Sequence, residues 1–101
     1  MIVIPDFSLP AAIVIPNVFT PNGDGVNDVF FPIMTSFKDA NCVIYDRWGA
    51  KIFELKTVND KWNGETEDGK LCPNGTYFYL FKGEDLMKKN YLLKGYVQLL
   101  R

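Results

Sequence analysis

Short apolar runs, separated by turn-forming residues at spacings of about ten residues, are the feature that most constrains the fold of this chain. The runs are rich in β-branched and aromatic residues, and Gly, Pro, Asn and Asp stand between them. Runs of this kind are typical of short strands, and their regular spacing indicates antiparallel pairing in a sandwich or barrel. Since 101 residues fit one domain, we predict an all-β, immunoglobulin-like antiparallel β-sandwich of about seven strands.

The expected strands follow from these runs. We place them at residues 13–15, 29–33, 41–48, 51–55, 76–81 and 91–100. The run 41–48 alternates, with Cys42 and Ile44 on one face. Residues 83–90 are charged and are expected to form a connection, which has room for one short helical turn. Residues 1–12 are interpreted as a linker or a first edge strand, because their prolines suit only a sheet edge.

The charge and the apolar pattern exclude several kinds of partner. The formal net charge is −1, so bulk charge does not favour nucleic acid. No apolar run approaches the roughly 20 residues that span a bilayer, so membrane insertion is not expected. The first residues do not form a signal peptide, so we interpret the chain as the C-terminal piece of a longer exported protein. We expect it to be a monomer.

The sequence offers no catalytic machinery. It contains no His, which is the commonest general base and metal ligand. Ser8 and Ser36 are its only serines, and neither lies in a GxSxG motif. Cys42 and Cys72 lack an activating base and are interpreted as two free thiols in preference to a disulfide. We therefore predict that the chain is not an enzyme.

The turn at residues 22–28 has two interpretations. Asn22, Asp24 and Asp28 offer oxygen ligands around Gly25, at a spacing similar to that of a calcium loop. The match is partial, because the first position is Asn and no bidentate Glu closes the loop. The alternative is a turn whose side chains bind its own backbone amides, and this alternative is favoured. Calcium is the one cofactor that the sequence leaves open.

Trp48 and Trp62 each stand beside a glycine in a turn. The favoured interpretation is that each indole covers an open end of the core, and the alternative is an aromatic platform for sugar or protein. Arg47 is expected to stack on a ring or to pair with an Asp of the 22–28 turn.

Five motifs, in order, carry a resemblance to a known family. They are IPNVFTPNGDGVND (residues 15–28), YDRWG (45–49), WNG (62–64), PNGTYFY (73–79) and KGYVQLLR (94–101). Together they resemble the gliding-motility-associated C-terminal domain, which is the type B sorting domain of the type IX secretion system of Bacteroidota. The likeness covers residues 13–101, and it departs from the family pattern at Asp46, where Asn is usual.

The resemblance implies a function. Domains of this family act as C-terminal sorting signals that direct a passenger through the type IX outer-membrane translocon to the cell surface or the medium. The passengers include gliding adhesins. The implied partners are the translocon and an outer-membrane protein of the SprF/PorP type. A different interpretation is an adhesive module that binds carbohydrate or protein.

The candidate recognition residues lie in the exposed turns and at the chain end. They are Asn22, Asp24, Asn27, Asp28, Arg47, Trp48 and Arg101. The edge of the closing strand is a further candidate, through strand addition.

Overall fold

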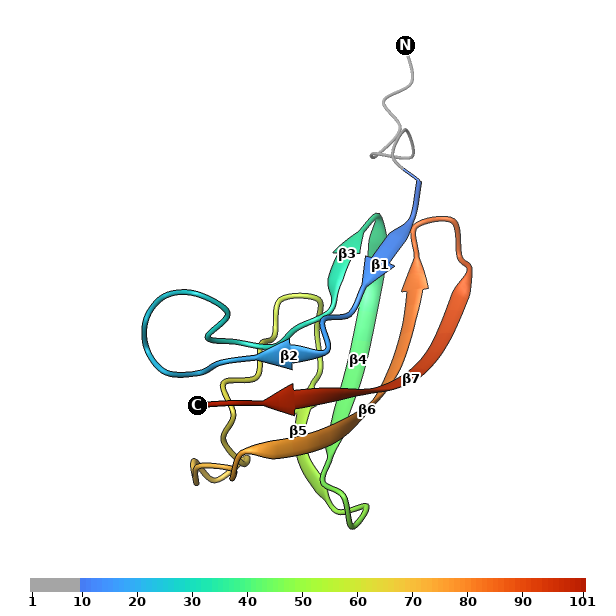
Figure 1. Cartoon of the computed structure of the whole chain (residues 1–101). Coiled ribbons are helices and arrows are strands. Elements are labelled where there is room, and N and C mark those ends of the chain that lie inside the picture. The colour runs from blue at the N-terminus through green and yellow to red at the C-terminus, as the bar shows by residue number, and fades with distance from the viewer. Residues whose placement is uncertain (1–9) are drawn as a thin grey trace.

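The computed structural model describes residues 10–101 (Figure 1), so residues 1–9 of the predicted linker lie outside the described part. Residues 10–101 contain no helix and seven strands: β1 (Ala12–Val14), β2 (Val18–Phe19), β3 (Ile33–Thr35), β4 (Phe37–Tyr45), β5 (Lys51–Leu55), β6 (Gly75–Asp85) and β7 (Asn90–Leu99). These strands form a two-stranded sheet, β1-β3, and a five-stranded sheet in the order β2-β7-β6-β4-β5. The predicted all-β class is confirmed, and the two sheets are consistent with an immunoglobulin-like sandwich.

The long strands β4, β6 and β7 form the antiparallel centre of the larger sheet. Their sequences alternate, so that one face of the sheet is apolar throughout. Cys42 and Ile44 of β4 are buried, as are Phe81 of β6 and Val97 of β7. β4 and β5, which correspond to the strands expected at 41–48 and 51–55, form a hairpin with Ile44 opposite Phe53, and β4 ends at Tyr45. The inward faces that the sequence predicts are therefore those that the structure buries.

Trp62 is the centre of the core, although it lies in the long connection between β5 and β6. Its ring is completely buried and lies 5.1 Å from the ring of Phe19 and 5.3 Å from that of Tyr77. Phe30 meets it edge-on at 6.4 Å. The indole nitrogen donates to the Glu65 carbonyl at 2.8 Å, so burial leaves no polar atom unpaired. The interpretation of Trp62 as a cover of the core is confirmed.

The strand β2 pairs with β7 in parallel, with Phe19 beside Leu99. The spacing of the turns predicts antiparallel pairs only, so the parallel pairing of β2 with β7 differs from the prediction. It arises because Pro16 and Asn17 carry the chain across from the small sheet to the outer edge of the large one. The parallel pair places the loop that follows Phe19 at the same end of the sheet as the last residues of β7 (Figure 1).

The connection between β6 and β7 is shorter than predicted. The expected charged segment 83–90 with a helical turn is wrong, because β6 extends to Asp85 and β7 begins at Asn90. Asp85 ends the strand: its carboxylate accepts hydrogen bonds from the amides of Met87 (2.8 Å) and Lys89 (2.9 Å) and from the hydroxyl of Tyr91 (3.0 Å). Lys88 adopts the positive φ of 68° that this tight turn requires.

The segment around Pro32 also differs from the prediction. Residues 29–33 were expected to be one strand, but β3 begins only at Ile33. Phe30 forms an isolated bridge with Trp62 instead, with hydrogen bonds of 2.7 and 2.9 Å between their main chains. Pro32 lacks an amide hydrogen and separates the two pairings. The side chain of Phe30 is thereby held in the core.

The aromatic cluster generates a test of stability. We expect Trp62→Ala to lower the free energy of unfolding by about 3–5 kcal/mol, since it removes a buried ring and leaves a cavity. Trp48→Ala, which truncates an exposed ring of the same size, is expected to stay within roughly 0.5 kcal/mol. Urea denaturation followed by circular dichroism measures both, and equal losses in the two variants would contradict this account.

The turn at Asp85 generates a test of pH dependence. The hydrogen bond from the Lys89 amide, with those from Tyr91 and Met87, holds the pKa of the Asp85 carboxyl below its usual range. The stabilisation is therefore present above the unfolded pKa of about 3.9 and is lost as the pH falls through the lower folded pKa. We expect Asp85→Asn to be less stable than the parent at pH 7, with a urea midpoint that changes less between about pH 5 and pH 2. Parallel pH profiles of the two proteins would argue against this role.

Candidate functional site

The hairpin turn at residues 46–50 is held rigid by one carboxylate. Asp46 accepts hydrogen bonds from the amides of Trp48 and Ala50, both at 2.9 Å, and its main chain is bonded to Ala50 and Gly49. Gly49 has a φ of 85°, which favours glycine. The departure from the family pattern at Asp46 thus keeps a side-chain oxygen that closes the turn.

Trp48 projects from this turn into solvent. Its side chain is 83% exposed, so the prediction that it covers the core is wrong. The reason is local: the bonds to Asp46 complete the turn before the chain can return to the core. An exposed indole leaves a large apolar surface in contact with water, and covering that surface in an interface would be favourable. Of the two tryptophans, Trp48 alone is available to a partner.

Arg47 lies against the same ring, with its Cζ atom 5.9 Å from the Trp48 centroid. This agrees with the expectation that it stacks on a ring. The expected alternative, an ion pair with an Asp of the 22–28 turn, is not among the ion pairs of residues 10–101. Arg47 and Trp48 therefore present a cation and an aromatic surface together at the tip of the hairpin.

The turn at residues 22–28 uses its side chains to hold its own backbone. Asn22 accepts from the Asp24 amide (3.1 Å), and Asp24 accepts from the Val26 amide (2.9 Å). The two oxygens of Asp28 accept from Gly23 (3.1 Å) and Gly25 (2.7 Å). This is the arrangement that the favoured interpretation of the sequence describes. Asn27 contributes its carbonyl to the Thr20 amide and has a φ of 53°.

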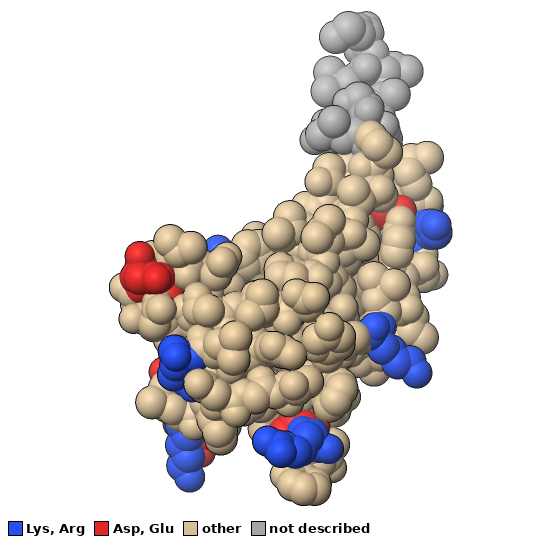
Figure 2. All heavy atoms as spheres, viewed as in Figure 1, with Lys and Arg blue, Asp and Glu red and all other residues tan. Residues whose placement is uncertain are grey.

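The same turn is an acidic feature of the surface. Figure 2 shows negatively charged side chains gathered on the loop at the left of Figure 1, which joins β2 to β3 and carries Asp24 and Asp28. Within residues 10–101 no group of three or more Cys, Asp or Glu side chains is arranged to hold a metal ion. The carboxylate oxygens that would bind calcium are those that accept the amides of the loop.

Arg101 is bound to the protein by its side chain. The guanidinium donates to the carbonyls of Gly64 (2.9 Å) and Cys72, and its main-chain amide donates to Asn74 (3.1 Å). These bonds join the end of β7 to the connection between β5 and β6. Arg101 therefore positions neighbouring loops, while the residue as a whole remains exposed.

The topology brings the predicted recognition residues to one end of the large sheet. The strands β2, β4 and β7 all end there, and β6 begins there, because Phe19 and Gly75 both lie beside Leu99. The 22–28 turn follows β2, the Trp48 turn follows β4, and Arg101 follows β7 (Figure 1). We name this set of loops the recognition end. The sequence alone did not reveal this grouping.

The two cysteines of the described part are not linked to each other. Both cysteines are free and buried, in agreement with their interpretation as separate thiols. Burial raises the pKa of the Cys42 thiol to about 12, so that it stays protonated at neutral pH.

Within residues 10–101 no helix has the length and apolar character needed to span a bilayer.

A further set of exposed side chains was missed by the sequence interpretation. Phe78 of β6 and Leu92 and Tyr96 of β7 point away from the core and are 45–61% exposed. The signal that could have found them is that β6 and β7 also carry large apolar residues at the alternate positions that face away from the core, where polar residues are usual.

The 22–28 turn generates a test for calcium. Because its oxygens already bind backbone amides, we expect millimolar calcium, or its removal by EDTA, to shift the melting temperature by less than about 4 °C. Asp28→Ala is expected to lower stability equally with and without calcium, since it removes the bonds to Gly23 and Gly25. A larger calcium-dependent rise in the parent, abolished in that variant, would establish an ion site.

The comparisons with known proteins agree with the motifs. The family model CHU_C, described as the type IX secretion signal domain, matches residues 13–99, which is most of the chain. No curated protein matches the sequence. The match begins inside β1 and ends at the last residue of β7, so it includes all the strands of the described part.

Proposed function

We propose that this chain, which belongs to the family of type IX secretion signal domains, is the sorting signal of a gliding-adhesin type of surface protein. The family is one of secretion signals and not of enzymes, and its members mark a protein for export by the type IX secretion system. Export implies that the domain reaches the medium or the cell surface. The passenger and its final attachment are the parts that we propose.

The observation that best supports the proposal is the exposed side chain of Trp48, in a turn whose main chain is held by Asp46. Trp and Arg are the residues that most often dominate binding energy at interfaces. Because Asp46 already fixes the main chain at Trp48, the backbone of the turn loses little conformational freedom when a partner covers the ring. The partner that we propose is the translocon together with an outer-membrane protein of the SprF/PorP type.

The neighbouring loops extend this surface. Asn22, Asp24, Asn27 and Asp28 form an ordered acidic turn at the recognition end, and Arg101 lies at the close of β7. We propose that the acidic turn supplies polar contacts at the rim of the interface, where charge affects the rate of association more than the affinity. We propose that this turn acts without a bound calcium ion, because its carboxylates already accept the amides of the loop.

One observation favours a second function. An exposed indole is a suitable surface for stacking a sugar ring, so an adhesive module would also use Trp48. Trp62 is unavailable for this purpose because it is completely buried. A glycan array separates the two functions: adhesion requires specific binding by the isolated domain that Trp48→Ala abolishes.

The proposal is tested by export of a fusion. The chain is fused to the C-terminus of a periplasmic reporter in a host with a type IX system. We expect the reporter to appear at the cell surface or in the medium, and Trp48→Ala to reduce the exported fraction at least about tenfold, the loss of a typical hot spot.

The matched control is Met87→Ala, which truncates another exposed apolar side chain at the opposite end of the sheet. It is expected to leave export unchanged. A folded parent fusion that stays in the periplasm would refute the sorting role, and equal export of the Trp48→Ala and parent fusions would refute the role of Trp48.

A further inference from the structure

The face of the large sheet that points away from Trp62 is unusually apolar. On β6 and β7 it carries Phe78, Leu80, Lys82, Leu92, Lys94 and Tyr96, which we name the outer face. Phe78 lies opposite Tyr96, and Leu80 lies opposite Lys94. An antiparallel sheet with one face in the core normally presents polar residues on the other. Four apolar side chains on two adjacent strands are therefore a candidate contact surface.

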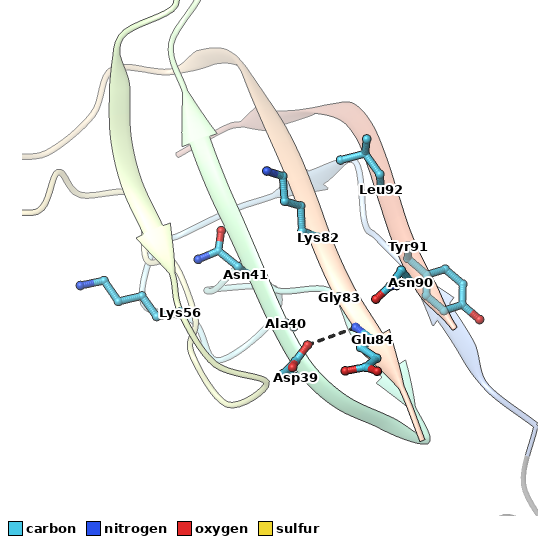
Figure 3. A pocket seen from close by; sticks show the side chains of 10 residues that line it. All are labelled: Asp39, Ala40, Asn41, Lys56, Lys82, Gly83, Glu84, Asn90, Tyr91 and Leu92. Carbon is cyan, nitrogen blue, oxygen red and sulfur yellow. Dashed lines mark hydrogen bonds between the residues drawn. The ribbon is translucent and has the colours of Figure 1, made fainter. Parts of the chain in front are cut away.

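The outer face is hollowed along its length. One hollow of about 740 Å³ runs between Tyr45 of β4 and the side chains of Phe78 and Tyr96. A second, of about 550 Å³, lies toward the other end of the strands (Figure 3). Lys82 and Leu92 line both hollows, and Figure 3 shows these two side chains next to each other on β6 and β7. The two hollows thus form one groove along the outer face.

The edge of β7 beside this groove is open. The Gln98 amide donates to the Asn17 carbonyl at 2.8 Å, so the main-chain groups of even-numbered residues in β7 point away from β6. In the described part of the chain β2 pairs only with Gln98 and Leu99. The outward amides of Leu92, Lys94 and Tyr96 have no backbone partner among residues 10–101. An added strand would therefore continue the line of β2 along β7.

The charge of the groove selects among occupants. Lys82 and Lys94 belong to none of the ion pairs of residues 10–101, and no Asp or Glu lines the larger hollow. If a second copy paired with this edge about a two-fold axis near Lys94, Lys94 of each copy would lie opposite Lys94 of the other. Like charges directly opposite each other destabilise a pair of strands. A segment with a carboxylate opposite Lys94 would gain a charge-assisted contact there.

We propose that the outer face and the open edge of β7 dock an extended partner segment that carries apolar residues at alternate positions around an acidic one. Main-chain hydrogen bonds to Leu92, Lys94 and Tyr96 hold the segment, and its apolar side chains cover Leu92 and Tyr96. The proposal rests on the proposed function in one respect only: the export or attachment machinery supplies the segment. The open edge of β7 is separated from the strand that leads to the Trp48 turn by β6, and the larger hollow reaches that strand at Tyr45.

The binding step is tested on the isolated chain with a defined probe. The probe is the peptide acetyl-Thr-Val-Thr-Glu-Thr-Phe-Thr-amide at millimolar concentration, and its counterpart has Lys in place of Glu. We expect the Glu probe to slow amide exchange of Leu92, Lys94 and Tyr96 at least about fivefold. It is expected to bind at least about tenfold more tightly than the Lys probe. The variant K82E/K94E is expected to reverse this preference.

Several outcomes would overturn the binding step. They are no protection by the Glu probe, equal binding of the two probes, and protection at β5 in place of β7. Self-association of the free chain that protects the same amides would assign the edge to a second copy. Binding of phosphatidylglycerol vesicles without protection of these amides would assign the face to a lipid surface.

The export fusion tests the source of the segment. The variants are L92K/Y96K, which removes apolar contact, and K94E, which changes only charge; Met87→Lys is the control. When the parent fusion is exported, we expect both groove variants to melt within about 4 °C of the parent. Their exported fraction is expected to fall at least about tenfold. Normal export of these folded variants would show that the machinery does not use the groove. Failure of the parent fusion would instead refute the proposed function and leave the probe result standing.

Discussion

The packing of Trp62 against Phe19 and Tyr77 is the interaction on which the rest of the structure depends. The second layer of this sandwich has only the short strands β1 and β3, which cannot cover the large sheet by themselves. The long connections on either side of the core therefore need an anchor. Trp62 supplies it for one connection, and its main-chain bridge to Phe30 supplies it for the other. The 22–28 turn lies between Phe19 and Phe30, which both pack on Trp62, so its two ends are held in this cluster.

Much of the fold was predictable because its long strands alternate. Period-2 patterning places Cys42 and Ile44 on one face of their strand, as the sequence predicts, and the structure buries that face. The errors occur where a tertiary contact decides local structure. Asp85 forms a compact turn that the charged composition of residues 83–90 does not reveal. Phe30 pairs with Trp62 and does not join a strand. Local patterns do not reveal this pairing, because the two residues are far apart in sequence.

The candidate site was predictable as residues but not as a surface. The sequence identified Arg47 and Trp48 from a turn motif, yet the exposure of Trp48 depends on bonds from Asp46 that complete the turn. The grouping of three loops at one end depends on strand order, which local patterns do not determine. The apolar outer face was missed for a related reason. The sequence identifies Phe78 and Tyr96 only as residues that favour strands, and the position of the core is needed to show that their side chains point away from it.

The parallel pair of β2 and β7 has a consequence for the order of folding. The hairpins β4–β5 and β6–β7 join strands that follow each other along the chain, so they can pair early, whereas β2 must wait for Gln98 and Leu99. A contact between segments so distant along the chain carries a large loop-closure entropy and forms late. The acidic loop after β2 therefore takes its place last. A partly folded chain would present the Trp48 hairpin without the neighbouring loop, and only the complete domain presents both.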